Sequence, residues 1–192
     1  RHCNPMGNLF QWEANLVSLF EKGLIHVYTG NGKGKTTAAM GLIVRCVGHG
    51  GKVAMVQFMK GWPFYGEIKG LNYLPGVELF RTGGEKCFRK GEHTEKDLRE
   101  AQRGLEISRK CVVDPKYDLV VLDEINVAVN FGLLALSDVL NLISIKLPTI
   151  ELVLTGRYAP NELIEVADLV TEMVEVKHPY QKDIMARKGI EY

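Results

Sequence analysis

Short runs of apolar and β-branched residues alternate along this chain with longer stretches rich in helix-forming residues. Such continuous apolar runs are typical of strands that are buried on both faces of a parallel sheet. They predict strands at residues 24–28, 53–58, 77–80, 118–122, 150–155 and 170–176. Helices are expected at residues 37–47, 94–113, 137–146 and 160–167. This alternation predicts an α/β fold, a single three-layer domain with a mainly parallel sheet.

Polar residues and proline mark where several of the expected helices begin. Thr94 and Asp97 resemble a capping box, with Asp in place of the usual Glu. Ser137 is expected to cap the next helix, and Pro160 suits the first turn of the last one. These residues are assigned structural roles.

Three stretches have the composition of ligand-binding loops. Residues 61–70 and 82–93 are rich in Gly, charged and aromatic residues, and both follow predicted strands, where open α/β sheets bind ligands. Residues 177–192 have little periodicity, and this tail either folds over a ligand or packs on the surface. The simpler interpretation of His178 within it is an ordinary polar loop residue.

The most specific motif lies between the first predicted strand and the first predicted helix. It reads Gly30-Asn31-Gly32-Lys33-Gly34-Lys35-Thr36, followed by Thr37. A glycine-rich turn directs consecutive backbone N–H groups toward phosphate oxygens, while Lys35 adds charge and Thr36 offers a hydroxyl to Mg²⁺. The order of strand, loop and helix favours a P-loop NTPase-like domain over a glycine-rich turn with a chance lysine.

The spacing within this motif departs from the usual one. Three residues separate Gly30 from the Gly34-Lys35 pair, where the usual pattern has four. Thr29 therefore occupies the usual first-glycine position. We expect the loop to hold a triphosphate differently from that of an ordinary NTPase.

A predicted buried strand ends in the acidic pair Asp123-Glu124. Either carboxylate can hold Mg²⁺ together with Thr36, directly or through water, or can instead cap a following helix. Glu124 has two further interpretations: it polarises water, as in motor-type ATPases, or it ligates metal and orients a second substrate in a group transferase. The motif does not discriminate between them.

Two arginines are candidates for binding phosphate. Arg157 follows a predicted strand in Thr155-Gly156-Arg157, where its guanidinium can clamp an oxyanion bidentately. Arg45 lies on the predicted helix after the loop and either turns back toward the phosphates or faces solvent.

Composition narrows the class of protein. The chain has 192 residues, 46% of them hydrophobic, which suits one domain at residues 24–192 after an N-terminal extension at 1–23. Residues 1–5 precede Met6, as a cloning remnant would, and are assigned no function. A formal net charge of +1 gives no global field that favours nucleic acid or an anionic membrane.

The sequence lacks membrane-span and signal-peptide patterns and lacks paired cysteines, and this sets expectations about the location of the protein and about zinc binding. No apolar run reaches the length of a membrane span, and the amino end lacks a signal-peptide pattern, so a cytoplasmic location is expected. The cysteines lack any Cys-x-x-Cys pair, which excludes a zinc site of that type and predicts free thiols at Cys3, Cys46, Cys87 and Cys111.

Taken together, these motifs resemble the P-loop class of corrinoid adenosyltransferases, the ATP:cob(I)alamin adenosyltransferases. The resemblance runs through most of the chain, and it is specific because the segments occur in a fixed order. The matching segments are 29–37, Arg45 with 47–50, 56–61, 120–124, 155–157, 176–178 and 189–192.

The resemblance implies an activity. The 5′-deoxyadenosyl group of ATP moves to Co(I) of a reduced corrinoid, triphosphate leaves, and the product is adenosylcobalamin or an adenosylated precursor. ATP is expected to lie reversed relative to ordinary P-loop hydrolases. The resemblance also implies Mg²⁺, a homodimer and an electron donor such as a reduced flavoprotein.

It further implies roles for individual residues. Catalysis is assigned to Lys35, Thr36, Glu124 and Arg157. ATP binding is assigned to Asn31, Gly32, Lys33, Gly34, Lys35, Thr36, Thr37 and Arg45. Mg²⁺ is assigned to Thr36, Asp123 and Glu124, and the corrinoid to Phe88, Trp62 and His178, with Phe64 and Tyr65 as secondary candidates.

The family displaces the lower axial ligand of cobalt with an aromatic environment. Enteric members carry two nearby aromatics in the loop after the third strand, whereas this chain has Cys87-Phe88 followed by Arg89-Lys90-Gly91. Phe88 is therefore the candidate for the corrin face, with simple loop packing as its alternative.

Two other functions fit part of the sequence. A generic Mg-dependent ATPase of the recombinase or motor type accounts for Asp123-Glu124, but the chain lacks a basic strip interleaved with aromatics for nucleic acid. A non-catalytic corrinoid or nucleotide carrier is disfavoured because Lys35, Thr36 and Asp123 are intact. A kinase fits the phosphate motif alone, without any acceptor-specific feature.

Overall fold

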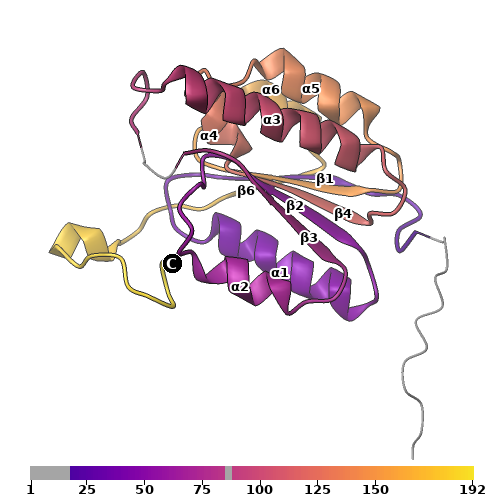
Figure 1. Cartoon of the computed structure of the whole chain (residues 1–192), viewed down its shortest axis with the longest axis horizontal. Coiled ribbons are helices and arrows are strands. Elements are labelled where there is room, and N and C mark those ends of the chain that lie inside the picture. Colours follow the sequence, from indigo (N-terminus) through magenta and orange to yellow (C-terminus); the bar gives the residue numbers. More distant parts are fainter. Residues whose placement is uncertain (1–17, 85–87) are drawn as a thin grey trace, which may run out of the picture.

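Six parallel strands form the middle layer of the structure, a computed structural model that describes residues 18–84 and 88–192 (Figure 1). In chain order they are β1 (Ile25–Thr29), β2 (Val53–Gln57), β3 (Val77–Arg81), β4 (Leu119–Asp123), β5 (Glu151–Thr155) and β6 (Leu169–Glu172). Their spatial order is β3-β2-β4-β5-β1-β6, and every neighbouring pair is parallel. The predicted α/β fold with a parallel sheet is confirmed.

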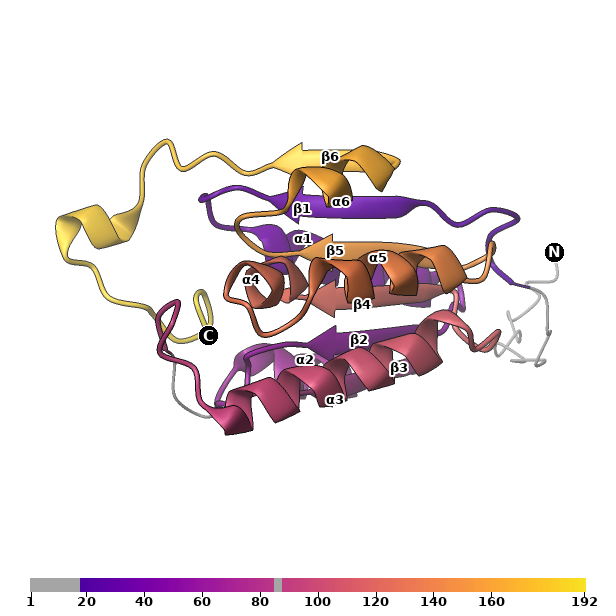
Figure 2. The same cartoon turned by 90° about the horizontal axis from the view of Figure 1, so that it is seen from above.

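Helices cover both faces of this sheet (Figures 1 and 2). On one face lie α1 (Lys35–Gly48) and α2 (Gly66–Asn72). On the other lie α3 (Glu95–Val112), α4 (Ile125–Asn130), α5 (Leu136–Ile145) and α6 (Asn161–Val166). Two apolar cores result, one on each face, and every residue of β2 and β4 is buried between them. This double burial explains why those strands have no polar alternation.

Two short helices were not predicted. The helix α2 begins within the stretch 61–70 that was expected to be a loop and ends at Asn72, and α4 follows closely after β4. They have seven and six residues, which is too short for a helical period to be recognised in the sequence. The predicted strand at 170–176 is also too long, because β6 ends at Glu172.

The helix caps agree only in part with the sequence analysis. Thr94 and Asp97 form the expected capping box at the start of α3. Ser137 does not cap α5. That helix begins at Leu136, so Ala135 occupies the N-cap and Ser137 lies in the first turn. Pro160 occupies the N-cap of α6 and precedes its first turn.

Two of the cysteines are described, and both are buried free thiols. Burial raises the pKa of Cys46 to about 12 and that of Cys111 to about 11. Cys3 and Cys87 lie outside the described residues, as does most of the expected extension at 1–23. The part described, 18–23, contacts the domain through the backbone N–H of Leu19, 2.6 Å from Asp118 Oδ1. No helix within the described ranges is long and apolar enough to cross a bilayer.

Candidate nucleotide and corrinoid site

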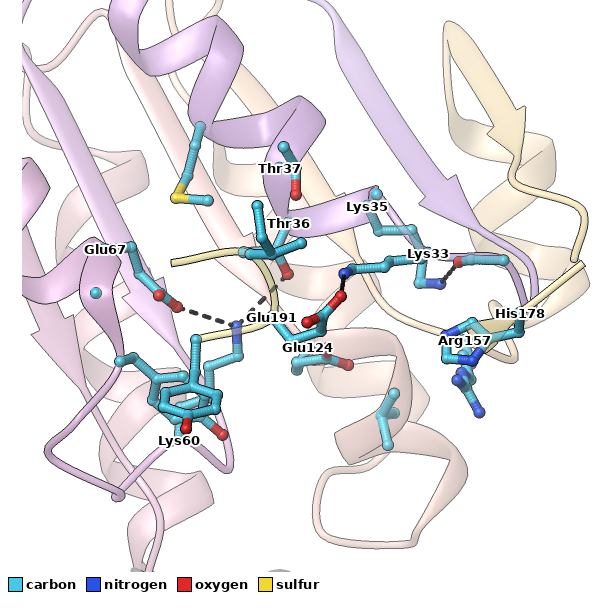
Figure 3. Close-up of a pocket in the computed structure, with 18 of the residues that line it drawn as sticks. Lys33, Lys35, Thr36, Thr37, Lys60, Glu67, Glu124, Arg157, His178 and Glu191 are labelled. Carbon is cyan, nitrogen blue, oxygen red and sulfur yellow. Dashed lines mark hydrogen bonds and ion pairs between the residues drawn. The ribbon is translucent and has the colours of Figure 1, made fainter. Parts of the chain in front are cut away.

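The carboxyl ends of the strands face a cavity of about 870 Å³, and the C-terminal tail lies at the same end of the sheet (Figures 2 and 3). Its walls come from the phosphate loop, the starts of α1 and α2, the turns after β4 and β5, and the tail. The charged and hydroxyl residues lining it include Lys33, Lys35, Thr36, Thr37, Lys60, Glu67, Glu124, Arg157, His178 and Glu191. Most of the predicted site residues are therefore brought together.

Lys35 folds back onto its own loop. Its Nζ donates hydrogen bonds to the carbonyl oxygens of Gly30 and Gly32, both at 2.7 Å. The side chain is buried, and that burial lowers the pKa of Lys35. Gly34 enters α1 with a φ of 117°, a conformation that favours glycine. The loop is thus held closed around its lysine.

The chain segment after β6 lies against the phosphate loop. The backbone N–H of Gly32 donates to the carbonyl oxygen of Met173 at 2.6 Å. A Cβ atom at Gly30 or Gly32 would lie only 2.5 or 2.6 Å from that same oxygen. Glycine is therefore required at both positions by this close approach, in addition to any contact with phosphate.

Asp123, fully buried at the end of β4, joins four elements of the structure. Its Oδ1 accepts hydrogen bonds from Thr36 Oγ1 at 2.8 Å and Thr155 Oγ1 at 2.7 Å. Its Oδ2 lies 2.7 Å from Lys60 Nζ and 3.3 Å from Gln57 Nε2. Burial acts to raise the pKa of Asp123, but the Lys60 ion pair and the hydroxyl hydrogen bonds outweigh it, so the pKa is lowered.

Lys60 and Glu67 belong to this site although the sequence analysis assigned them no role. Lys60 Nζ lies 3.5 Å from Thr36 Oγ1 and 3.7 Å from Glu67 Oε1, as well as beside Asp123 (Figure 3). Both side chains are only 12–13% exposed. The position of Lys60 in the sequence could have revealed its role. It follows β2 within one of the matching segments, at the sheet edge where ligands bind.

Glu124 has a backbone conformation that is rare for a residue with a side chain. Its φ is 65°, and its N–H donates to Thr155 Oγ1 at 3.0 Å. It occupies the N-cap position of α4 but its side chain makes no capping hydrogen bond, and it lines the cavity instead. Burial, followed by the nearby charge of Asp123, raises the pKa of Glu124. Such a strained, cavity-facing acid is typical of functional sites.

The two candidate arginines lie in different places. Arg157 is exposed and lines the cavity after β5. Arg45 lies on the last turn of α1 and borders a separate cavity of about 310 Å³, beside His49 and Glu151. It lies ten positions along the helix from Lys35, about 15 Å along the axis. The structure thus does not bring Arg45 to the phosphate loop, and the solvent-facing alternative describes its position.

Aromatic rings gather at one side of the cavity. Trp62 makes edge-on contacts with Phe64, Tyr65 and Tyr192, with ring centroids 5.4, 5.1 and 5.3 Å apart. Tyr65 and Tyr192 line the cavity, while Trp62 packs against them and Phe64 is 68% exposed. This cluster joins the loop after β2 to the last residue of the chain.

Two predicted contacts lie away from the cavity wall. Phe88 packs on the core that includes α3 and α4, and its ring centroid is 6.1 Å from that of Phe131. Phe131 lines the cavity and Phe88 does not, so the structure supports the loop-packing alternative for Phe88. Asn31 is exposed and also lies outside the lining.

The C-terminal tail crosses the cavity (Figure 3). Glu191 forms an ion pair with Lys33 of the phosphate loop and another with Arg187, at 3.1 Å. Hydrogen bonds from Arg187 and Lys33 lower the pKa of Glu191 to about 2. His178 lines the cavity and accepts a hydrogen bond from the N–H of Tyr180 at 3.2 Å. Of the two alternatives for the tail, the structure shows the one in which it folds over the site.

A parallel sheet with a glycine-rich loop between β1 and α1, and a buried acid at the end of β4 beside the first residues of α1, defines a P-loop nucleotide-binding protein. The family model for ATP:corrinoid adenosyltransferases of the BtuR/CobO/CobP type matches residues 21–192. The chain belongs to this family, as the sequence resemblance predicted.

Individual relatives agree with the family match. The corrinoid adenosyltransferase of Sinorhizobium sp is 40% identical over 174 residues, which cover 90% of this chain and 81% of the relative. That of Pseudomonas aeruginosa is 38% identical over 172 residues, or 90% and 85%. The corrinoid adenosyltransferase CobA of Salmonella typhimurium is 37% identical over 173 residues, or 90% and 87%.

Proposed function

We propose that this protein transfers the 5′-deoxyadenosyl group of ATP to the Co(I) centre of a reduced corrinoid, such as cobalamin or a cobinamide-type precursor, and releases triphosphate. The observation that supports this most directly is the composition of the cavity. One wall carries the phosphate loop and the acidic network, and another carries the aromatic cluster, in a chain that belongs to the adenosyltransferase family. The cavity thus offers polar contacts suited to a nucleotide and apolar contacts suited to a large second substrate.

The reaction sets what the protein must do. A Co–C bond forms with the electron pair of Co(I). The bond between C5′ and its phosphate oxygen breaks, and the triphosphate leaves with the electron pair of that C–O bond. No side-chain nucleophile is needed. The protein contributes by aligning C5′ with cobalt and by dispersing the charge that develops on the triphosphate.

Positive groups around the loop suit the second task. Lys35 is expected to leave the carbonyl oxygens of Gly30 and Gly32 and to contact the phosphates, while Arg157, which also lines the cavity, clamps the triphosphate. Lys33 becomes available when Glu191 moves away from it. Arg45 is omitted from this assignment because it lies at the far end of α1.

The residues present fit a magnesium ion. Among the described residues, no three His, Cys, Asp or Glu side chains are grouped so as to enclose a metal by themselves. Mg²⁺, however, takes few protein ligands beside nucleotide phosphates and water. Thr36 and Asp123 would hold it, with Glu124 as a further oxygen ligand, and the ion would supply charge neutralisation at the phosphates.

The aromatic cluster is the proposed corrinoid wall. Tyr65 and Tyr192 border the cavity, and Trp62 packs behind them as a second layer. His178 lines the same cavity and stays a proposed corrinoid contact. In this assignment Tyr65 and Tyr192 replace Phe88, which packs on the core. Apolar ring faces there would disfavour a polar lower ligand on cobalt.

The proposal includes a homodimer in the cytoplasm that receives electrons from a reduced flavoprotein. The dimer and the electron donor rest on the family resemblance alone, and the location rests on the sequence pattern described above. Analytical ultracentrifugation tests the dimer, and replacing a chemical reductant by a reduced flavoprotein in the activity assay tests the donor.

An anaerobic assay with ATP, Mg²⁺ and chemically reduced cob(I)alamin tests the function. We expect a light-sensitive Co–C product by its absorption spectrum, together with intact triphosphate. Release of orthophosphate without corrinoid alkylation would instead identify a P-loop ATPase and reject the proposal.

A further inference from the structure

The ammonium group of Lys60 lies where three oxygen-bearing side chains converge. Its Nζ is 2.7 Å from Asp123 Oδ2, 3.7 Å from Glu67 Oε1 and 3.5 Å from Thr36 Oγ1. These groups come from β4, α2 and α1, so three separate elements place oxygen atoms around one cation. Thr36 and Asp123 are the residues to which Mg²⁺ has just been assigned.

The surroundings of Lys60 require a cation. Asp123 is fully buried, and a buried carboxylate without a positive partner is strongly unfavourable. Gln57 is also fully buried, and its Nε2 contacts both Asp123 and Glu67. Its Oε1 has no hydrogen-bond partner among the described residues. One buried oxygen of a residue in this network is therefore left without a hydrogen bond to any described residue.

We propose that Lys60 is an exchangeable internal cation of the phosphate site. In the nucleotide-free protein it neutralises Asp123, and it gives up this position to the divalent cation that arrives with ATP. Its ammonium then contacts the triphosphate. The inference rests on the proposed function in one respect, namely that Mg²⁺ and a nucleoside triphosphate are the ligands of this cavity.

The side chain of Lys60 is suited to such a move. It lines the cavity, and four methylene groups let the ammonium swing without any backbone change. Glu67 also lines the cavity and offers a second partner, and the ring of Tyr65 lies 5.5 Å from Nζ. A divalent cation bound to Asp123 Oδ2 would occupy the place of the Lys60 ammonium and repel it. Metal binding at this oxygen and the present position of Lys60 therefore exclude one another.

Competition has a measurable consequence. Removing the charge of Lys60 should make the nucleotide-free protein bind a divalent cation more tightly, although the same change weakens binding of the metal–nucleotide complex. A purely structural lysine would give no gain in metal affinity.

Mn²⁺ binding, followed by electron paramagnetic resonance without nucleotide, tests this in Lys60→Gln. We expect about tenfold tighter Mn²⁺ binding than in the wild type and about tenfold weaker binding of Mg²⁺ with a non-hydrolysable ATP analogue. Lys69→Gln is the matched control, because Lys69 is an exposed lysine of α2, and both affinities should stay unchanged. Unchanged or weaker Mn²⁺ binding in Lys60→Gln would overturn the proposal.

A second measurement covers the case in which Lys60→Gln fails to fold because Asp123 loses its partner. Wild-type protein labelled with ¹³C at the lysine ε carbons is titrated with Mg²⁺ and the ATP analogue, and Lys60→Arg assigns the Lys60 signal. We expect this signal to shift when both ligands are present; a signal that stays unchanged contradicts the exchange. Neither readout involves a corrinoid, so failure of the adenosyl transfer assay would leave these results interpretable on their own.

Discussion

The hydroxyl of Thr36 donates a 2.8 Å hydrogen bond to the carboxylate of Asp123, although 87 positions separate the two residues along the chain. The bond connects the first turn of α1 to the end of β4. The two halves of the phosphate site are therefore held in alignment by the protein's own contacts. Such preorganisation removes a cost that would otherwise oppose ligand binding.

This hydrogen bond predicts that activity depends on the hydroxyl of Thr36 more than on the branched shape of its side chain. Thr36→Val keeps the branched side chain but removes the oxygen, and we expect a loss of about 100-fold in kcat/KM for ATP. Thr36→Ser keeps the hydroxyl and should retain most of the activity. Steady-state kinetics at several Mg²⁺ concentrations measure both, and equal losses in the two variants would show that packing alone is responsible.

We expect Glu124 to lower the stability of the folded protein at neutral pH while being needed for transferase activity. Because burial and the nearby charge of Asp123 raise the pKa of Glu124 in the folded protein above its ordinary value of 4.5, the folded state binds this proton more tightly than the unfolded state does. The free energy of unfolding therefore falls as the pH rises from about 4.5 through the raised pKa. Glu124→Gln abolishes this loss, so the variant should be more stable than the wild type at neutral pH while losing transferase activity.

Chemical unfolding of both proteins at a series of pH values measures this difference. Each 1 kcal/mol gained would raise the melting temperature by about 2–4 °C. Glu165→Gln, an exposed acid on α6, is the control and should leave the pH dependence as it is in the wild type. A Glu124→Gln protein that is less stable above neutral pH would contradict the expected sign.

We expect kcat/KM to depend on the planar guanidinium group of Arg157. Arg157→Ala should lower kcat/KM by about 10–100-fold, because a charge-assisted contact to the triphosphate is lost. Arg157→Lys should recover only part of this, since an ammonium cannot make the bidentate contact. Arg99→Ala, which removes an arginine that is 71% exposed on α3, should have little effect. Isothermal titration with an ATP analogue separates a binding defect from a catalytic one.

The sequence predicted those parts of the site that are marked by local patterns, and it did not predict the contacts that only the folded sheet creates. The sheet and the phosphate loop were recognised because their signals are local: apolar runs for β1, β2, β4 and β5, and consecutive glycines for the loop. Asp123 was found for the same reason, as the acid that ends a buried run.

Residues that meet only in three dimensions were missed or misplaced. Lys60 and Glu67 converge on Asp123 because β2 and β4 are neighbours in the sheet, which no spacing along the chain reveals. Arg45 was assigned to ATP with a solvent-facing alternative, and its place in the last turn of α1 favours that alternative. Phe88 was chosen for its loop, whereas ring packing onto Phe131 turns it toward the core.

The tail predicts a spectroscopic signal. Because the pKa of Glu191 is lowered to about 2, its ion pairs with Lys33 and Arg187 form fully above the ordinary Glu pKa and are lost only as the pH falls through about 2. Trp62, whose ring is 5.3 Å from that of Tyr192, reports whether the tail stays in place. Its emission should remain constant from pH 7 to about 4, where these pairs persist.

A Trp12→Phe background makes Trp62 the single tryptophan for this measurement. Glu191→Gln in the same background should show a red-shifted emission at every pH, because Trp62 becomes more exposed when the tail is released. Far-ultraviolet circular dichroism, recorded in parallel, separates tail release from unfolding. A wild-type shift near pH 5 with unchanged circular dichroism would be inconsistent with the ion pairs.

The hydrogen bond from the Gly32 N–H to Met173 gives the edge strand an influence on ligand affinity. One amide of the phosphate loop is already occupied before any ligand arrives. A triphosphate must either bind with the remaining amides or wait for the segment after β6 to detach. Edge strands fray more readily than central ones, and all four residues of β6 are exposed. Nucleotide affinity in this enzyme is thus linked to how often the margin of its sheet opens.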